Sequence, residues 1–263
     1  FSVQRLILPI FDGKLEIKDF QAAEKKGEWS WKFSGGLSPL SLSSLTKSLK
    51  LPELKGNISG DIPVVEYTNH DIKMGGALVI QLLDGFAIIK DVALYRALGD
   101  APRFTADVDA RNLDLALMTE AFSFGKMQGR VDLRINDMEL VKWKPVKMDA
   151  SLMSSPGSYT KKISQQAVQN ISSLGGAGAV AAIQRSFLRF FEQFGYEKIG
   201  LSCKLNNNIC EMGGVESTPD GYVIVKGGGI PAITVMGYNR TVSWQEFLDR
   251  VGRIAKDNAS PVI

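Results

Sequence analysis

The stretch LSLSSLTKSLKLPELKGNISGDIP at residues 40–63 decides the fold, because it returns as LDLALMTEAFSFGKMQGRVDLRIN at residues 113–136. The two copies align without a gap, with Leu40 on Leu113 and Gly56 on Gly129. Their apolar positions match in character at Leu40/Leu113, Leu42/Leu115, Leu45/Met118, Leu49/Phe122, Leu51/Phe124, Leu54/Met127, Ile58/Val131 and Ile62/Ile135. A unit that cannot bury its own apolar face becomes stable by stacking on a copy, so the repeat predicts an elongated structure.

A second, shorter repeat precedes each copy. GKLEIKDF at residues 13–20 returns as GFAIIKDV at residues 85–92. The repeated pairs Lys18-Asp19 and Lys90-Asp91 could suggest acid–base chemistry. Because they recur with the repeat, packing at a strand end or a turn explains them better.

The first part of the chain alternates between apolar and polar residues. EWSWKF (28–33), FTADVDA (104–110) and RVDLRIN (130–136) each have the period of two that marks a strand with one apolar face. We therefore expect a mainly β protein with helical additions, in which antiparallel units form a curved open trough. Residues 1–157 form this segment, with repeats at about 13–84 and 85–157, and residues 158–263 form a helical C-terminal cap.

The cap begins with two predicted helical stretches between residues 163 and 194, separated by Gly175-Gly176-Ala177-Gly178. The second stretch, about residues 179–194, has an unusually wide apolar surface. It could dock onto the sheet, act as a lid over an apolar channel, or contact a membrane or a partner. Its candidate contact residues are Ile183, Phe187, Phe190, Phe191 and Phe194.

A terminal helix is predicted over residues 243–256. Ser243 is the expected N-cap, with Glu246 as its capping-box partner. The expected buried stripe consists of Phe247, Leu248, Val251, Ile254 and Ala255.

Two cysteines, Cys203 and Cys210, flank a polar Asn206-Asn207-Asn208 tip. Asparagine tolerates left-handed backbone, so this segment is predicted to be a hairpin whose cysteines lie within disulfide reach. The alternatives are two free thiols or half of a metal site, although no second cysteine pair exists. A disulfide favours an oxidising compartment such as the periplasm.

Catalytic and cofactor signals are weak. Gly176-x-Gly178-x-x-Ala181 matches a dinucleotide fingerprint, but a predicted helix rather than a strand precedes it. The single histidine, His70, lies in a polar turn-like segment, and no G-x-S-x-G nucleophile motif occurs. We expect no enzyme activity and no cofactor.

The formal net charge of +3 is too small to indicate nucleic acid as a partner. Lys25, Lys26 and Lys32 do lie among Trp29 and Trp31, as in some nucleic-acid-binding faces. Trp29, Trp31 and Phe33 share one strand face, however, which favours core packing. No stretch is long and apolar enough to cross a bilayer. The chain begins at Phe1 without a signal-like segment, so we expect it to begin inside a longer protein that carries any membrane anchor.

The order of motifs carries a resemblance. A G-x-[LA]-x-I-K-D strand, an alternating strand, an L-x-L-x-x-L short helix and L-x-G-x-[IV]-x-[GL]-x-I follow one another. This order resembles the periplasmic repeat of the AsmA-like proteins of Gram-negative bacteria, the group that includes TamB, YhdP and YdbH. Residues 162–214 resemble the C-terminal end of the YdbH-type members.

The resemblance implies a β-taco: a sheet curled into a trough that carries phospholipids between the inner and outer membranes. It implies phospholipid acyl chains as ligands, a small outer-membrane lipoprotein as a candidate partner, and no catalytic residues. The candidate wall residues are Leu15, Ile17, Trp29, Trp31, Phe33, Ile58, Ile62, Leu78, Ile80, Ile88, Phe104, Val108, Val131, Leu133 and Ile135. A filled sandwich core would show the same sequence pattern. A cell-envelope scaffold that binds a partner by strand addition is the alternative function.

Overall fold

The computed structural model describes residues 1–48, 56–175 and 191–257 of the chain. The chain forms two compact units. Unit 1 comprises Phe1–Arg111 and Arg134–Met148, and unit 2 comprises Asn112–Leu133 and Asp149–Ile263. This division differs from the predicted repeat-and-cap boundary at residue 157, because residues 112–133 of the second repeat group with the C-terminal region.

Strands dominate both units, in agreement with the predicted mainly β fold. The strands are β1 (Ser2–Ile10), β2 (Gly13–Lys25), β3 (Glu28–Ser41), β4 (Asn57–Thr68), β5 (Asp71–Met74), β6 (Ala77–Leu82), β7 (Gly85–Tyr95), β8 (Arg103–Asp114), β9 (Met127–Gln128), β10 (Arg130–Val141), β11 (Lys144–Ser154), β12 (Lys162–Ser164), β13 (Gln193–Asn206), β14 (Ile209–Gly214), β15 (Glu216–Thr218), β16 (Gly221–Gly227), β17 (Val235–Gly237) and β18 (Thr241–Ser243). The helices are α1 (Leu42–Ser48), α2 (Leu115–Ala121), α3 (Gln165–Gly175) and α5 (Trp244–Asp257).

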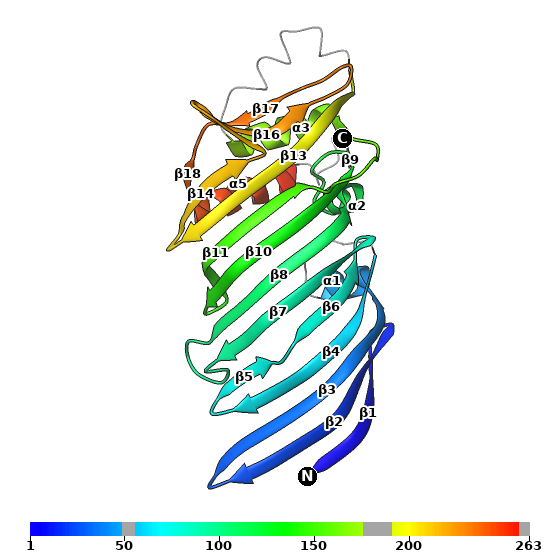
Figure 1. Ribbon diagram of the computed structural model, residues 1–263, viewed down its shortest axis with the longest axis vertical. Helices are drawn as coiled ribbons and strands as arrows, with labels where there is room; N and C mark the ends of the chain where they lie inside the picture. The colour runs from blue at the N-terminus through cyan, green and yellow to red at the C-terminus, as the bar shows by residue number, and fades with distance from the viewer. Residues whose placement is uncertain (49–55, 176–190, 258–263) are drawn as a thin grey trace. The chain divides into compact units, whose positions relative to one another are not determined.

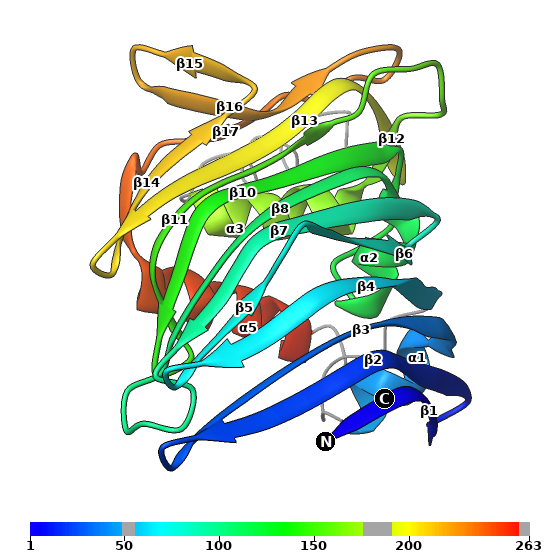
Figure 2. The ribbon, with the colours of Figure 1, turned by 60° about the horizontal axis from the view of Figure 1, so that its bottom comes forward.

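The sheet of unit 1 is antiparallel and follows the chain. Strands β1 to β4 each pair with the next strand, and β7 pairs with β5, β6 and β8 (Figure 1). Short connections such as Asn69-His70, both with positive φ, make these hairpins, because left-handed turn residues match the twist of paired strands. Figure 2 shows the strands as a curved sheet, and β1 pairs only with β2 among the described strands. The predicted open, curved, antiparallel architecture is confirmed.

The sequence repeat is a structural repeat. Helices α1 and α2 begin at the aligned residues Leu42 and Leu115. The Leu42 amide donates to the Gly56 carbonyl at 2.9 Å, and the Leu115 amide donates to the Gly129 carbonyl at 3.1 Å. Both glycines have positive φ, of 119° and 148°, which a side chain would disfavour. The repeated motif therefore encodes a strand, a short helix and a glycine that returns the chain to the sheet.

The repeated Lys-Asp pairs lie inside strands rather than at their ends. Asp19 and Asp91 have φ of 50° and 54°, and the pairing register shifts at both places. Each aspartate is thus the extra residue of a β-bulge, since aspartate tolerates the left-handed conformation better than most side chains. The expected strand-end or turn position is corrected to an interior bulge.

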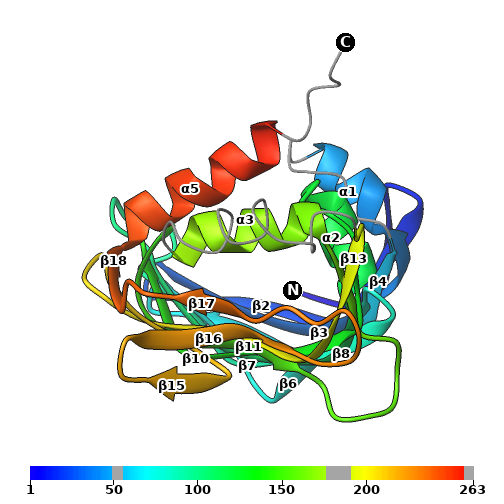
Figure 3. The same cartoon turned by 90° about the horizontal axis from the view of Figure 1, so that it is seen from above.

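Unit 2 buries its core between strands and helices. Strand β13 pairs with β12, β14 and β16, and β16 also pairs with β15 and β17. Helices α3 and α5 lie on one side of β13, β16 and β17 (Figure 3). Helix α3 buries Ala167, Val168 and Ile171 on one face, and Val225 and Val235 on the strands are fully buried. Unit 2 is thus a sheet with its apolar side covered by helices.

The predicted helix over residues 179–194 is wrong at its C-terminal end. Phe194 belongs to β13, where it lies opposite Ile163 and is 1% exposed. Phe191 is 37% exposed and precedes the strand. Ile183, Phe187 and Phe190, like the Gly176-x-Gly178-x-x-Ala181 motif, lie outside the described residues. Backbone pairing with β12 fixes residues 193–194 as strand, a long-range effect that helical periodicity does not show.

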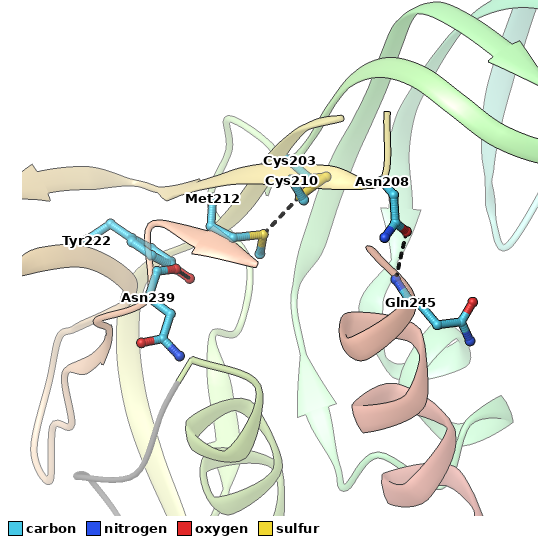
Figure 4. The surroundings of a disulfide bond; sticks show 7 residues. All are labelled: Cys203, Asn208, Cys210, Met212, Tyr222, Asn239 and Gln245. Atoms are coloured by element: carbon cyan, nitrogen blue, oxygen red, sulfur yellow. Dashed lines mark hydrogen bonds between the residues drawn. A yellow bond between two sulfur atoms is a disulfide. The ribbon is translucent and has the colours of Figure 1, made fainter. Parts of the chain in front are cut away.

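The terminal helix α5 is confirmed, but its cap differs from the prediction. Asn208, at the tip of the β13–β14 hairpin, accepts the Gln245 amide at 3.3 Å through its side-chain oxygen (Figure 4). Its carbonyl also accepts the Trp244 amide at 2.8 Å. The Ser243 hydroxyl instead accepts from the Asn208 side chain. Leu248 is 42% exposed, so it does not belong to the buried stripe in which Ile254 lies.

We expect Asn208→Gly to loosen the start of α5 while keeping the hairpin turn. Asn208 has φ of 69°, which glycine adopts freely, so only its side-chain hydrogen bonds with the Gln245 amide and the Ser243 hydroxyl are lost. Each such hydrogen bond contributes about 1 kcal/mol. Hydrogen exchange of the first turn of α5 should rise. Asn207→Gly, with φ of 45° at the same tip, is the matched control and should leave exchange in α5 unchanged.

Candidate functional site

The strand registers of unit 1 place large apolar side chains on one side of its sheet. Trp31 lies opposite Tyr67, Tyr67 opposite Ile72, Ile72 opposite Leu94, and Leu94 opposite Phe104. Directly opposed residues of paired strands point to the same side. These five residues therefore form a continuous apolar row across five strands. Trp31 and Tyr67 also stack, with ring centroids 5.5 Å apart.

Further apolar rows lie on the same side. The bulge at Asp91 inserts one residue into β7, so Ile89 and Leu94 share a face despite their odd spacing. The remaining rows are Leu78–Ile89–Val108, Ile80–Ala87–Ala110, Phe33–Val65–Met74, Ile17–Gly35–Ile62 and Leu15–Leu37–Gly60. We call this side, together with Ile58, the apolar face of unit 1.

The opposite side of the same sheet is charged. Lys32 lies opposite Glu66, Glu66 opposite Lys73, and Lys90 opposite Asp107. Glu16 pairs with Arg5 and Lys18 on this side. Although desolvation acts in the other direction, the hydrogen bond from Lys18 and the charge of Arg5 lower the pKa of Glu16. Opposite charges across strands favour this face in water, so the sheet is amphipathic.

The large side chains of the apolar face are only half-buried. Each of them, like the other large residues in these rows, keeps part of its surface exposed to solvent. The predicted wall residues in this state are Leu15, Ile17, Trp31, Phe33, Ile58, Ile62, Leu78, Ile80, Phe104 and Val108. The fully buried apolar residues of unit 1, in its described part, are three leucines and four alanines: Leu40, Leu42, Leu83, Ala87, Ala93, Ala106 and Ala110. A filled sandwich core would bury the large residues first. In unit 1 the described residues leave this face incompletely covered.

Five predicted wall residues are placed differently from the rest. Ile88 lies opposite Val79 and Asp109, which puts it on the charged side and corrects its assignment to the same wall. Trp29 lies opposite Glu24 near a hairpin tip and is 58% exposed. The other three lie on β10. Val131 is completely buried, in unit 2, whereas Leu133 and Ile135 are half-buried. Arg134 between them points to Asp109 on the charged side, at 4.0 Å.

Several residues of the apolar face are absent from the wall predicted from the sequence. Tyr67 and Ile72 flank the Asn69-His70 turn, and Leu94 follows the Asp91 bulge. The alternation in VVEYT and DIK could have indicated the first two. Alternation does not indicate Leu94, because the bulge at Asp91 shifts the alternation of the two faces along β7 by one residue.

Unit 2 contains an apolar cavity of about 300 Å³. Its wall combines α2 and the segment after it with α3, α5 and the strands β9, β10, β11, β13, β14 and β16. The lining residues are Met118, Thr119, Phe122, Phe124, Met127, Val131, Leu152, Ile171, Leu174, Ile199, Gly200, Leu201, Met212, Tyr222, Ile224 and Val251. We call this space the unit 2 cavity.

The unit 2 cavity is electrically neutral. Its lining contains no Asp, Glu, Lys, Arg or His among the described residues. Burial raises the pKa of Tyr222, with Arg250 acting in the opposite direction, so its phenol stays protonated at neutral pH. The Thr119 hydroxyl donates to the Leu115 carbonyl at 2.9 Å, within its own helix. The cavity therefore suits an uncharged, apolar occupant.

The predicted disulfide is confirmed beside this cavity. Cys203 and Cys210 are bonded, with their Cα atoms 5.5 Å apart (Figure 4). They are diagonal rather than directly opposed, because Cys203 faces Met212 and Cys210 faces Leu205. The Cys210 sulfur lies 3.1 Å from the Met212 sulfur, and Met212 lines the cavity. The disulfide thus supports one wall of the unit 2 cavity.

Within the described residues, no group of three or more His, Cys, Asp or Glu side chains is arranged to hold a metal ion. None of the helices in this part of the chain is long and apolar enough to span a bilayer. His70 is exposed in the β4–β5 turn, as the sequence predicts.

Comparison of the chain with protein-family models, with curated proteins and with solved structures finds no match. The chemistry of the two apolar surfaces is therefore the basis for inferring a function.

Proposed function

We propose that this chain is part of a periplasmic lipid carrier, in which phospholipid acyl chains cover the apolar face of unit 1. The observation that carries the proposal is the half-buried state of the large apolar residues on that face. A contiguous apolar surface that stays partly exposed across several strands marks a binding surface for protein, lipid or membrane.

Acyl chains are the ligand that this face suits. Each methylene group removed from water contributes about 0.8 kcal/mol, so a single acyl chain gains several kcal/mol on such a surface. The rows hold no charged side chain, and several hold glycine or alanine, such as Gly35 and Ala87. A surface without polar anchors holds a chain without fixing its position, which allows the lipid to move along the strands.

The disulfide supports the periplasmic part of the proposal. Disulfides persist in oxidising compartments and are rare in the cytosol. The resemblance to AsmA-like proteins, and to the C-terminal end of YdbH-type members, points to the same compartment. On this proposal a membrane anchor lies elsewhere in a longer protein, and a small outer-membrane lipoprotein is a candidate partner. Catalysis, a cofactor and nucleic acid have no part in it.

Substitution of neighbouring residues on β6 tests the proposal. Ile80 is on the apolar face and Val79 is on the charged side, where it is 46% exposed. We expect Ile80→Asp to remove most labelling of unit 1 by a phospholipid that carries a diazirine in its acyl chain, because a carboxylate disfavours acyl contact. Val79→Asp, the matched control, should label like the unmodified chain.

The readout is peptide mass spectrometry after irradiation, with circular dichroism to show that both variants are folded. Equal labelling of folded Ile80→Asp and unmodified protein would contradict the proposal. So would an Ile80→Asp variant that fails to fold while Val79→Asp folds normally, because that result indicates a filled core.

A cell-envelope scaffold is the second candidate, and strand β1 favours it. Leu6, Ile7 and Leu8 on β1 are 43%, 47% and 40% exposed, and β1 pairs only with β2 among the described strands. A strand with a free edge and apolar side chains could accept a strand from a partner. Strand addition uses the backbone of β1, so partner binding that persists in Ile80→Asp would separate this function from lipid carriage.

A further inference from the structure

We propose that the unit 2 cavity is a fixed binding site for the end of one linear aliphatic chain. This inference does not depend on lipid movement over unit 1, because all lining residues belong to unit 2. It assigns the two apolar surfaces different roles. The apolar face of unit 1 accepts chains without fixing them, whereas the cavity holds one chain end in place.

The volume suits a chain end rather than a whole lipid. An engineered apolar cavity of about 150 Å³ stays dry and binds benzene, and the unit 2 cavity has about 300 Å³. A methylene group fills a volume close to the ~30 Å³ share of a water molecule, so about ten methylene groups fit. A second acyl chain or a headgroup does not fit beside them.

The chemistry of the wall excludes a polar ligand. A charged or strongly polar group would lose its hydration, and the described lining offers it no charged partner. The Thr119 hydroxyl already donates to a backbone carbonyl, and the Tyr222 phenol is neutral. The headgroup of any bound amphiphile must therefore lie outside the cavity, and binding should be indifferent to its chemistry.

The wall also adapts to chain shape. Met118, Met127 and Met212 line the cavity from three different elements. Methionine is unbranched and polarisable, so it fills irregular gaps and repacks around different ligands. Chains of different length or unsaturation should therefore bind with similar affinity.

A hydrogen bond between two helices lies beside the cavity. Arg250 of α5 donates to the Leu174 carbonyl near the end of α3 at 3.2 Å, and its guanidinium also contacts Glu246 at 2.6 Å. Leu174 and Val251, the neighbours of this link, both line the cavity. The link joins α3 and α5 next to two lining residues, so it holds this part of the cavity wall in place.

Filling the cavity tests the proposal on the full chain. Val251 of α5 lines the cavity, whereas Leu248, one turn earlier, is 42% exposed and does not. The probe is a long-chain fatty acid with a diazirine near its methyl end. After irradiation, peptide mass spectrometry should place label on unit 2 lining residues such as Leu152 and Ile199. Val251→Trp should reduce this label at least about tenfold, which corresponds to two displaced methylene groups.

Leu248→Trp is the matched control and should keep full unit 2 labelling. The corresponding fatty alcohol probe should label the same residues, since no headgroup enters the cavity. Label on the apolar face of unit 1 should be unchanged in Val251→Trp, so failure of this proposal is distinguishable from failure of lipid carriage.

Two results would overturn the inference. The first is unchanged unit 2 labelling in folded Val251→Trp. The second is the absence of unit 2 label in the unmodified chain.

Discussion

Val131→Asp is expected to destabilise unit 2 by about 4 kcal/mol or more, because it places a carboxylate where no surface is open to water. Val131 is 0% exposed, and the adjoining unit 2 cavity offers the carboxylate no charged partner. The loss is comparable with the whole stability of many domains, so the core of unit 2 should open. Hydrogen exchange of β13 and β16 should become fast.

Ile135→Asp provides the contrast on the same strand. Ile135 is half-buried, and its substitution should cost about 1 kcal/mol and leave exchange in both units close to that of the unmodified chain. The two substitutions lie four residues apart on β10, so the comparison tests whether Val131 is in a covered core while Ile135 is on an apolar surface that stays partly open. Equal destabilisation by the two variants would contradict the difference in burial on which the proposed function depends.

Replacing both cysteines, as Cys203→Ala with Cys210→Ala, should lower the stability of unit 2 by about 2–3 kcal/mol. The bond closes a short loop, with a sequence separation of 7, and a disulfide stabilises mainly by restricting the unfolded chain. The measurement is the urea concentration at the midpoint of unfolding of unit 2, with hydrogen exchange as the readout of unfolding.

The same experiment has an internal control. A reducing agent should shift the unfolding of the unmodified chain to that of the double variant and leave the double variant unchanged. Reduction should also weaken labelling of the unit 2 cavity, because Met212 of its wall contacts the Cys210 sulfur. A double variant as stable as the unmodified chain would show that pairing of β13, β14 and β18 alone holds this hairpin.

Local patterns predicted the elements whose causes are local. The Asn206-Asn207-Asn208 tip, the disulfide, the terminal helix and the repeated short helices all follow from turn chemistry, spacing or periodicity within a few residues. Errors arose where a distant segment decides the outcome. Phe194 is a strand residue because it pairs with Ile163, and the first turn of α5 donates to Asn208 of the β13–β14 hairpin, far back in the sequence.

The candidate site shows the same division. Alternation identified about half of the residues of the apolar face, including Ile17, Trp31 and Phe104. It placed Ile88 on this face instead of its neighbour Ile89, and it missed Leu94 because the Asp91 bulge shifts the alternation along β7 by one residue. Alternation also could not distinguish buried Val131 from half-buried Ile135, since each lies between two polar residues in the sequence.

The sequence by itself determined the repeat, the antiparallel β class and the disulfide, because each depends on residue types at fixed short spacings. Only the tertiary structure decided which side of each strand is apolar and how much of that side remains open. Those properties depend on the register between strands, on bulges and on the helices that cover unit 2. The cavity exists for the same reason, since its wall is assembled from helices and strands that are distant in the sequence.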